Sequence, residues 1–421
     1  MSLHARGDET PTSRGVQWFT ATAAVESVGD SLARSLLPIV AVSVLGAGTA
    51  TVGVLNSLGL GAFLLLALPV GVLADCWSAP VSMMTVSSLV RAGATLGVVA
   101  AWAAGQLSGA VGLMLLLAFA LTIGIADVVF TAGQGLLVPR LVEPEEIRGV
   151  FGRMQTATQA GGAIGPLVLS GLLALLAAPL VWVASTVMYL VSAAAQRGIA
   201  PLRPGPPPQP RVSMWAMARA GTGQLFAHPL LARITVANVL NNAAVMAANT
   251  LLPVIALTVL GLAPAVYAGI GVVGALAGIA GAMTASTITA RLGLRITRLA
   301  SSAAMTLGAV LVMLTATQTL PGPPAAWLAL QSALAASATA VAMVAGSDLA
   351  PRLVDPERLG TVLGAQRTLV LGIMPVAAVT TGLLGSTLGT ITTTWVWLVL
   401  AVTSAVPILT LPRGEESRPE L

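Results

Sequence analysis

Residues 138–155 read VPRLVEPEEIRGVFGRMQ, and residues 350–367 read APRLVDPERLGTVLGAQR. Eight of the 18 positions are identical at a constant offset of 212 residues, and two more are conservative, Glu143 with Asp355 and Ile147 with Leu359. The identical positions include proline, arginine and glutamate, which chance agreement between apolar segments does not produce. The repeat therefore indicates a chain built from two related halves.

The composition around this repeat is that of a membrane protein. Of the 421 residues, 56% are hydrophobic and only 8% are charged, whereas soluble domains carry roughly 25% charged residues. So few charges cannot cover a water-exposed surface, so most of the chain must face lipid.

Twelve stretches are long and apolar enough to cross a bilayer, for which a helix needs about 20 residues. They are residues 17–44, 50–74, 81–104, 109–137, 155–175, 178–197, 231–259, 264–288, 298–318, 324–346, 361–384 and 389–411. Each copy of the repeat follows the fourth stretch of its half. The sequence thus predicts an all-α membrane protein with twelve transmembrane helices in two six-helix bundles, and such parallel repeats are typical of secondary transporters.

The arginines predict the orientation in the membrane. All 20 basic residues are arginine. If both termini are cytoplasmic, 18 of them lie in cytoplasmic segments or at inner helix ends, and the six outer loops contain none. Only Arg34 and Arg91 fall within helices. This positive-inside distribution predicts a multi-pass protein of the cell membrane with both termini in the cytoplasm.

A proline-rich segment separates the two halves. Residues 204–210 read PGPPPQP, which cannot be helical because proline locks φ and lacks the amide donor. We expect a first bundle over 1–197, a cytoplasmic linker over 198–228 and a second bundle over 229–421. Residues 213–226 could form a short surface helix within the linker.

Charged residues inside the predicted helices are candidates for function, because ionisable groups at the bilayer centre are costly. Glu26, Asp30 and Arg34 follow one another at intervals of four and so share one face of the first helix. Arg91 lies in the third helix and Asp127 in the fourth. One interpretation is that Asp30, Glu26 or Asp127 takes up a proton during transport. The alternative is a fixed Asp30–Arg34 pair, with Arg91 neutralising Asp127 or Glu26.

The two bundles, the long basic middle loop and the repeat resemble the major facilitator superfamily along essentially the whole chain. The local runs at residues 28–30, 139–142 and 226–231 are most similar to drug and natural-product exporters of the macrolide-efflux and enterobactin-exporter type. This resemblance implies transport by alternating access.

The family's signature Gly-x-x-x-Asp-Arg-x-Gly-Arg, which latches the cytoplasmic gate, is split in this chain. Gly71 and Asp75 match its first part after the second helix, without the basic residues. Arg291, Gly293 and Arg295 form the complementary remnant in the second half. The resemblance implies that these five residues belong to the cytoplasmic gate.

The resemblance also implies roles for two further groups of residues. The fifth helix carries a Gly-x-x-x-Gly-Pro pattern similar to that of proton-coupled antiporters, although small residues also serve helix packing; its members are Gly161, Gly165 and Pro166. Helices 1, 4, 7 and 10 line the substrate cavity in the family, so amides on helices 7 and 10 are candidates for substrate contact or for interhelical hydrogen bonds. These amides belong to Asn238, Asn241, Asn242, Asn249 and Gln331.

Other classes of protein find little support in the sequence. The GIGVVG run at 269–274 fits a dinucleotide fingerprint, but it lies inside a predicted membrane helix without the strand that this motif needs. We find no P-loop, no nucleophile–base pair for an enzyme and no basic face for nucleic acid, and a single cysteine with two histidines suggests no metal site.

The sequence therefore predicts a proton-coupled exporter of small hydrophobic drugs or natural products. Its partners would be the small-molecule substrate, protons and the lipid bilayer, and it would act as a monomer without a cofactor. An importer of a small metabolite and a transport-inactive receptor or scaffold on the same fold are the alternatives.

Overall fold

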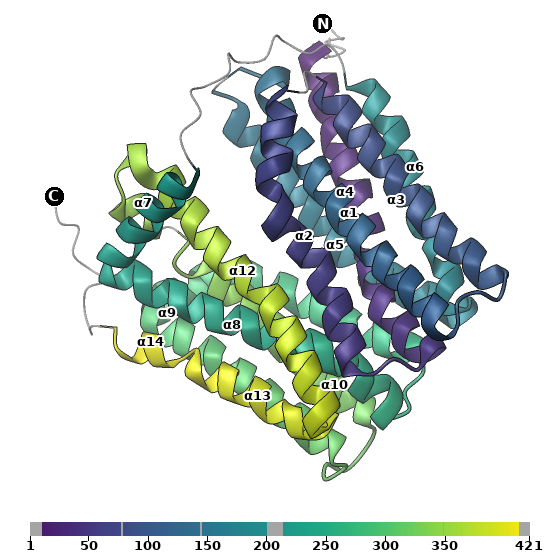
Figure 1. The fold of residues 1–421 in the computed structure, drawn as a ribbon. Helices are drawn as coiled ribbons and strands as arrows, with labels where there is room; N and C mark the ends of the chain where they lie inside the picture. The colour runs from purple at the N-terminus through teal and green to yellow at the C-terminus, as the bar shows by residue number, and fades with distance from the viewer. Residues whose placement is uncertain (1–10, 77–78, 144, 200–213, 348, 412–421) are drawn as a thin grey trace, which may run out of the picture. The chain divides into compact units, whose positions relative to one another are not determined.

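The computed structural model describes residues 11–76, 79–143, 145–199, 214–347 and 349–411, and all regular elements of the described chain are helices joined by short loops (Figure 1). The long helices of the first half are α1 (Pro11–Leu45), α2 (Thr49–Cys76), α3 (Pro80–Ala103), α4 (Gly109–Leu141), α5 (Ile147–Leu175) and α6 (Trp182–Ala195). Those of the second half are α8 (Pro229–Val254), α9 (Pro264–Ala316), α10 (Pro324–Val344), α12 (Pro356–Leu388) and α13 (Thr390–Thr403).

Short elements complete the chain. They are η1 (Ala178–Val181), η2 (Gln196–Gly198), α7 (Met214–Ala227), the π-helical η3 (Ile255–Val259), α11 (Leu349–Leu353) and α14 (Val406–Leu409). The helix expected over 213–226 is present as α7. Gly221 of α7 packs closely on α12, since a methyl group added there would lie 2.4 Å from the carbonyl oxygen of Thr361.

Eleven helical segments of the described chain are long and apolar enough to cross a membrane. The longest, α9, has 53 residues and would extend about 80 Å if it were straight, more than twice the thickness of the hydrocarbon core. It bends at Gly293, where φ is 77° and ψ is 160°, into arms of residues 264–292 and 294–316. Since each arm is long enough to cross the bilayer, the prediction of twelve transmembrane helices is confirmed.

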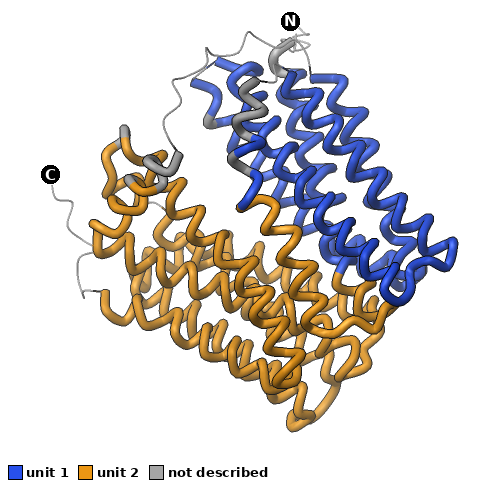
Figure 2. The backbone as a smooth tube through the Cα atoms, in the orientation of Figure 1, with its two compact units in different colours: residues 1–37, 65–209 blue, residues 38–64, 210–421 orange. Residues whose placement is uncertain are grey.

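The chain divides into two compact units (Figure 2). The first unit contains residues 1–37 and 65–209, and the second contains residues 38–64 and 210–421. The second part of α1 and the first part of α2 thus group with the second half of the sequence.

The first unit has a core at which α1, α3 and α4 meet. Phe19, Met84 and Leu137 are among its buried side chains. Trp182 of α6 is fully buried, lies 5.0 Å from the Phe119 ring and donates a hydrogen bond to the carbonyl oxygen of Ala33 at 3.3 Å. These contacts fix α6 against α1 and α4.

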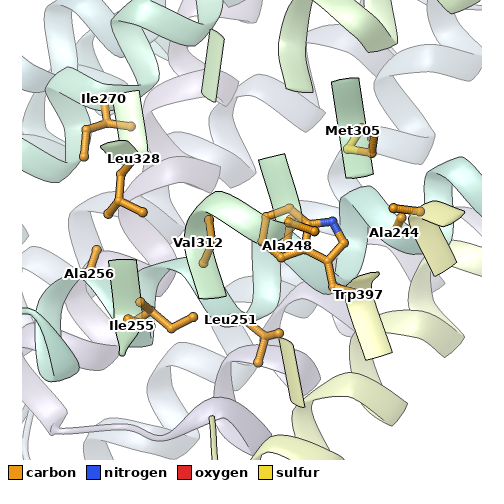
Figure 3. Close-up of a cluster of buried hydrophobic side chains, with 14 residues drawn as sticks. Ala244, Ala248, Leu251, Ile255, Ala256, Ile270, Met305, Val312, Leu328 and Trp397 are labelled. Carbon is orange, nitrogen blue, oxygen red and sulfur yellow. The ribbon is translucent and has the colours of Figure 1, made fainter. Parts of the chain in front are cut away.

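The second unit is built around Trp397 of α13, which is fully buried (Figure 3). Leu251 of α8, Val312 of α9 and Leu328 of α10 belong to the same cluster. Inside a bilayer, packing of this kind stabilises the bundle mainly through van der Waals contact, because lipid tails are as apolar as the side chains.

Glycines let α2 and α12 approach closely within this second unit. A methyl group on Gly53 would lie 2.4 Å from the carbonyl oxygen of Ala378, and one on Gly385 would lie 2.5 Å from the Thr49 hydroxyl oxygen. The Thr49 hydroxyl donates a hydrogen bond to the carbonyl oxygen of Gly382 at 3.1 Å. The backbones of α2 and α12, more than 300 residues apart in the sequence, are thereby in direct contact.

The bend in α9 leads to a prediction about Gly293. Its backbone conformation is essentially restricted to glycine, so Gly293→Ala should cost about 1–3 kcal/mol. We expect a lower melting temperature and a lower yield of folded protein, measured by thermal unfolding in detergent. Gly97→Ala is the matched control, because Gly97 is exposed, lies in α3 and has open space around its Cα. Equal melting temperatures for both variants would contradict this account of the bend.

Candidate functional site

The stripe of Glu26, Asp30 and Arg34 on α1 faces the interior of the first unit. Glu26 is only 2% exposed, and the side chains of Asp30 and Arg34 are 21% and 35% exposed. A helix places residues four apart on one face, so the three side chains form a row that runs from a buried end to a partly open end.

Arg91 of α3 is the centre of the cluster. Its guanidinium is fully buried, and its Nη1 lies 3.0 Å from Oε1 of Glu26 and 2.8 Å from Oδ1 of Asp30. Its carbon Cζ lies 5.0 Å from the centre of the Phe130 ring and 5.6 Å from that of Tyr189. One nitrogen of a buried cation is therefore shared by two carboxylates, between two aromatic rings that also favour a cation.

Arg34 has a different partner, Asp127 of α4. Its Nη2 donates a hydrogen bond to Oδ2 of Asp127 at 2.7 Å, while Nη2 of Arg91 lies 3.6 Å from Oδ1 of the same aspartate. The alternative of an intrahelical Asp30–Arg34 pair is thus not what the structure forms. Each arginine instead reaches across to other helices, so the cluster joins α1, α3 and α4.

Polar side chains without charge complete the cluster, and none of them was predicted from the sequence. The Tyr189 hydroxyl of α6 donates to Oδ1 of Asp30 at 2.8 Å. The Ser88 hydroxyl of α3 donates to both carboxylate oxygens of Glu26, at 3.2 and 3.1 Å. Gln196 donates in turn to Ser88. Tyr189 is one of only two tyrosines in the chain, and that rarity was the one signal that could have drawn attention to it.

A cavity of about 360 Å³ adjoins the cluster between α1, α4 and α5. The charged side chains open onto it from α1 and α4. The remaining wall is formed by Ala23, Ser27, Ser31, Phe130, Thr131, Gln134, Thr158 and Gly162. A molecule in this space would therefore meet hydroxyl, amide and charged groups beside one aromatic ring.

The glycines of α5 pack closely against α1 below this cavity. A methyl group on Gly161 would lie 2.6 Å from the carbonyl oxygen of Ala24, and one on Gly165 would lie 2.0 Å from the Ser31 hydroxyl oxygen. The Ser27 hydroxyl donates to the carbonyl oxygen of Thr158 at 2.5 Å. Pro166 follows within α5. The pattern on the fifth helix thus positions the helix that carries the acidic stripe.

The amides of α8 and α10 lie in the second unit, and three of the five make contacts with another helix. Asn238 accepts a hydrogen bond from Arg298, and Asn242 donates to the carbonyl oxygen of Val370 in α12 at 3.0 Å. Gln331 is 2% exposed and packs on Gly308. Asn241 is half-buried, and the Asn249 side chain is exposed.

Of the five residues expected at the cytoplasmic gate, three have described side chains. Gly293 forms the bend in α9, Arg291 beside it is exposed, and Arg295 donates to the carbonyl oxygen of Leu409 at 2.9 Å. Gly71 and Asp75 fall in α2, but their side chains lie outside the described residues.

Twelve membrane-spanning helices, built from two related sequence halves, with a buried charge cluster beside a cavity, define a polytopic transporter. The chain belongs to the Major Facilitator Superfamily, whose family model matches residues 19–370. It is therefore a multi-pass membrane protein and a secondary transporter, not an enzyme. No curated protein matches it by sequence.

Solved structures of diverse transporters share its fold. The nucleoside transporter NupG is 14% identical, with 94% of this chain and 97% of that chain covered and a TM-score of 0.70. An inward-facing bacterial homologue of the iron transporter ferroportin is 15% identical, with 94% and 98% covered and a TM-score of 0.71. An inward-facing, occupied bacterial homolog of the human lysosomal transporter Spinster is 14% identical, with 93% and 96% covered and a TM-score of 0.69. Such low identity shows the fold alone.

The carboxylates of the cluster bind arginine guanidiniums and hydroxyl groups, and they are not arranged around a metal site. Among the described residues, no group of three or more histidine, cysteine or acidic side chains could hold one.

The shared position of Arg91 generates a prediction about stability. Arg91→Met leaves Glu26 and Asp30 buried without their cation, and removing one partner of a buried pair typically costs about 3–5 kcal/mol. We expect a large fall in melting temperature in detergent. Arg34→Met should cost clearly less, since its pair with Asp127 is partly exposed and exposed pairs contribute about 0–1 kcal/mol.

The control is the triple variant Arg91→Met with Glu26→Gln and Asp30→Asn, which removes the unpaired charges and should recover part of the lost stability. If Arg91→Met had the same melting temperature as the unsubstituted protein, Arg91 would not neutralise the two carboxylates as described.

Proposed function

We propose that the protein is a proton-coupled exporter of small hydrophobic compounds that works by alternating access. The observation that carries this proposal is a charge count. The buried cluster holds three carboxylates, Glu26, Asp30 and Asp127, against the two guanidiniums of Arg34 and Arg91. Fully ionised it has a net charge of −1, and with one added proton it is neutral.

Net charge inside a bilayer is costly. The protonated, neutral cluster is therefore favoured when the site is closed to water, and the ionised cluster is favoured when water can enter. Opening the site on one side and then on the other would load and release one proton in each cycle. This exchange couples proton flow to movement of the protein.

The proton exchanges at the pair formed by Glu26 and Asp30. Both accept from the same Nη1 atom of Arg91, whereas Asp127 has Arg34 as a partner of its own. Because these two carboxylates share one cation, one negative charge of the pair is in excess, and a single proton added to the pair neutralises it. Asp30, which also lines the cavity, is the member within reach of a substrate.

The cavity supports a small-molecule substrate. Its volume of about 360 Å³ falls within the range of ligand pockets, about 300–1,000 Å³. Phe130 supplies an apolar face, while Thr131 and Gln134 supply hydrogen-bonding groups. Most of the lining residues are polar or charged, so this wall would bind the polar group of a hydrophobic drug or natural product, with Phe130 against its apolar part.

The direction of transport rests on the glycine pattern of α5 and on the resemblance to exporters.

We also propose that the protein lies in the cell membrane as a monomer with both termini cytoplasmic. The split signature, from Gly71 and Asp75 to Arg291, Gly293 and Arg295, would contribute to its cytoplasmic gate, and the exposed Asn249 side chain would be the α8 amide free to contact substrate. An importer would run the same proton chemistry in reverse, and a receptor on this fold would bind ligand without flux.

Replacing Asp30 with Asn should abolish proton-driven export while leaving protein abundance unchanged. The purified chain, reconstituted into liposomes with an imposed pH gradient, is assayed with ethidium and a panel of neutral hydrophobic fluorophores. The unsubstituted protein should move at least one probe against its gradient, and Asp30→Asn should move none because the pair can no longer exchange its proton.

Thr122→Val is the matched control, since Thr122 of α4 is bonded only within its own helix, to the carbonyl oxygen of Ala118 at 2.8 Å. Full proton-driven export by Asp30→Asn would contradict the proposal. Flux in the direction opposite to export would favour the importer, and binding without flux would favour the receptor.

A further inference from the structure

A line of buried hydrogen bonds leads away from the carboxylate of Glu26 through α3 to the end of α6. The Ser88 hydroxyl donates to Glu26, and Nε2 of Gln196 donates to the Ser88 hydroxyl oxygen at 3.1 Å and to the Ser192 hydroxyl oxygen at 3.3 Å. The Ser192 hydroxyl of α6 is a second hydrogen-bond partner of the Glu26 carboxylate. The Thr85 hydroxyl lies 2.6 Å from Oε1 of Gln196, closer than its other acceptor, the carbonyl oxygen of Val81 at 2.9 Å. Ser88 and Gln196 are both 0% exposed, and neither is among the described residues that line the cavity.

The chemistry of the amide fixes the direction of this line. An amide nitrogen only donates and an amide oxygen only accepts, so the side of Gln196 that faces Ser88 decides where the serine hydrogen points. The 2.6 Å contact between Gln196 and Thr85 has the length of an O–H···O bond rather than an N–H···O bond, which places the amide oxygen toward Thr85. Nε2 then faces Ser88, whose own hydrogen remains for Glu26.

We infer that Gln196 is a positioning residue that acts through Ser88 to set the pH at which Glu26 exchanges its proton. This inference rests on the proposed function, in which Glu26 shares the exchanging proton with Asp30. A hydroxyl donor stabilises the ionised carboxyl more than the protonated one. By committing the Ser88 hydrogen to Glu26, Gln196 favours release of the proton.

The charged and titratable neighbours of Glu26 act alongside this hydroxyl. Arg91 of α3 contacts it directly, Asp30 shares that guanidinium, and the Tyr189 hydroxyl of α6 donates to Asp30. Asp127 of α4 lies 3.6 Å from Arg91 and is itself paired with Arg34.

None of these charged groups is bonded to Gln196. The residues that α5 contributes to the cavity beside the stripe are uncharged; they are Thr158 and Gly162. Substitution at Gln196 therefore changes the hydroxyl groups bonded to Glu26, those of Ser88 and Ser192, and leaves the charges in place.

A purely structural role for Gln196 would make a different prediction. The same two helices are also joined by a second buried hydrogen bond, between the hydroxyls of Thr95 in α3 and Thr186 in α6 at 2.8 Å. This bond has no contact with Glu26 among the described interactions. Thr186→Val thus removes a buried contact from the same helix pair without disturbing the donor to Glu26, and it provides the matched control.

The test is a pH titration of the reconstituted full chain by infrared difference spectroscopy, which detects the protonated carboxyl group without any substrate. The band that disappears in Glu26→Gln identifies Glu26. Ser88→Ala should move the midpoint of this band upward by about 1 pH unit, and Gln196→Met should move it by about half as much. Gln196 also donates to Ser192, so additivity is tested in a Ser192→Ala background. There the double variant should match Ser88→Ala, because residues that act through one group are not additive.

Gln196→Asn, whose amide is one methylene too short to reach Ser88, should give the same upward shift and replaces Gln196→Met if that variant misfolds. Thr186→Val should leave the midpoint unchanged.

Two outcomes overturn the inference in distinguishable ways. If a Glu26 band is present but neither Gln196 variant moves its midpoint, or if the shifts of Ser88→Ala and Gln196→Met add in the Ser192→Ala background, then Gln196 does not act through Ser88 and the proposed function stands. If no band between about pH 5 and pH 9 is lost in Glu26→Gln, then Glu26 does not exchange a proton, and its part in the proposed function fails as well.

Discussion

The rest of the first unit is organised around one guanidinium, that of Arg91, held without contact to water between two carboxylates. A buried cation must be matched by acceptors, and buried carboxylates must be matched by donors. This requirement brings α1 and α3 together directly and recruits α6 through the tyrosine and glutamine contacts. The glycines of α5 allow that helix to pack closely on α1 next to the cavity. The same interaction leaves one carboxylate in excess, and the proposed proton coupling rests on this excess charge.

Much of this could be predicted from the sequence, because membrane helices must be long and apolar and charges within them stand out. The twelve helices and the row of Glu26, Asp30 and Arg34 follow from length and four-residue spacing. The partners of these charges could not be predicted, since pairing across helices depends on rotation and depth. Ser88 and Gln196 were missed because uncharged polar residues are common in such helices. The loop expected between the eighth and ninth helices is instead a bend at Gly293, because helix continues through the polar residues on both sides of it.

The two halves carry the same arrangement with different charges. The repeat offset of 212 residues aligns Glu26 with Asn238, and Asp30 with Asn242. In the second unit, Arg298 of α9 is 4% exposed and donates to Asn238 and to the carbonyl oxygen of Ala342, and no carboxylate of the described residues lies within 4.0 Å of it. An arginine thus contacts Glu26 in the first unit and Asn238 at the aligned position in the second. Only in the first unit is the arginine paired with acidic side chains of the described residues. The proposed proton chemistry is therefore placed in the first unit, while the second unit offers neutral polar contacts.

The most direct test of the charge count is to count protons. Purified protein and the double variant Glu26→Gln with Asp30→Asn are titrated in parallel with a pH indicator, at equal concentration and without substrate. The account predicts that the unsubstituted chain takes up one more proton than the variant as the pH falls from about 9 to about 5, since a single proton neutralises the cluster. Identical proton uptake by the two proteins would mean that the pair exchanges no proton over this pH range, and it would contradict the account.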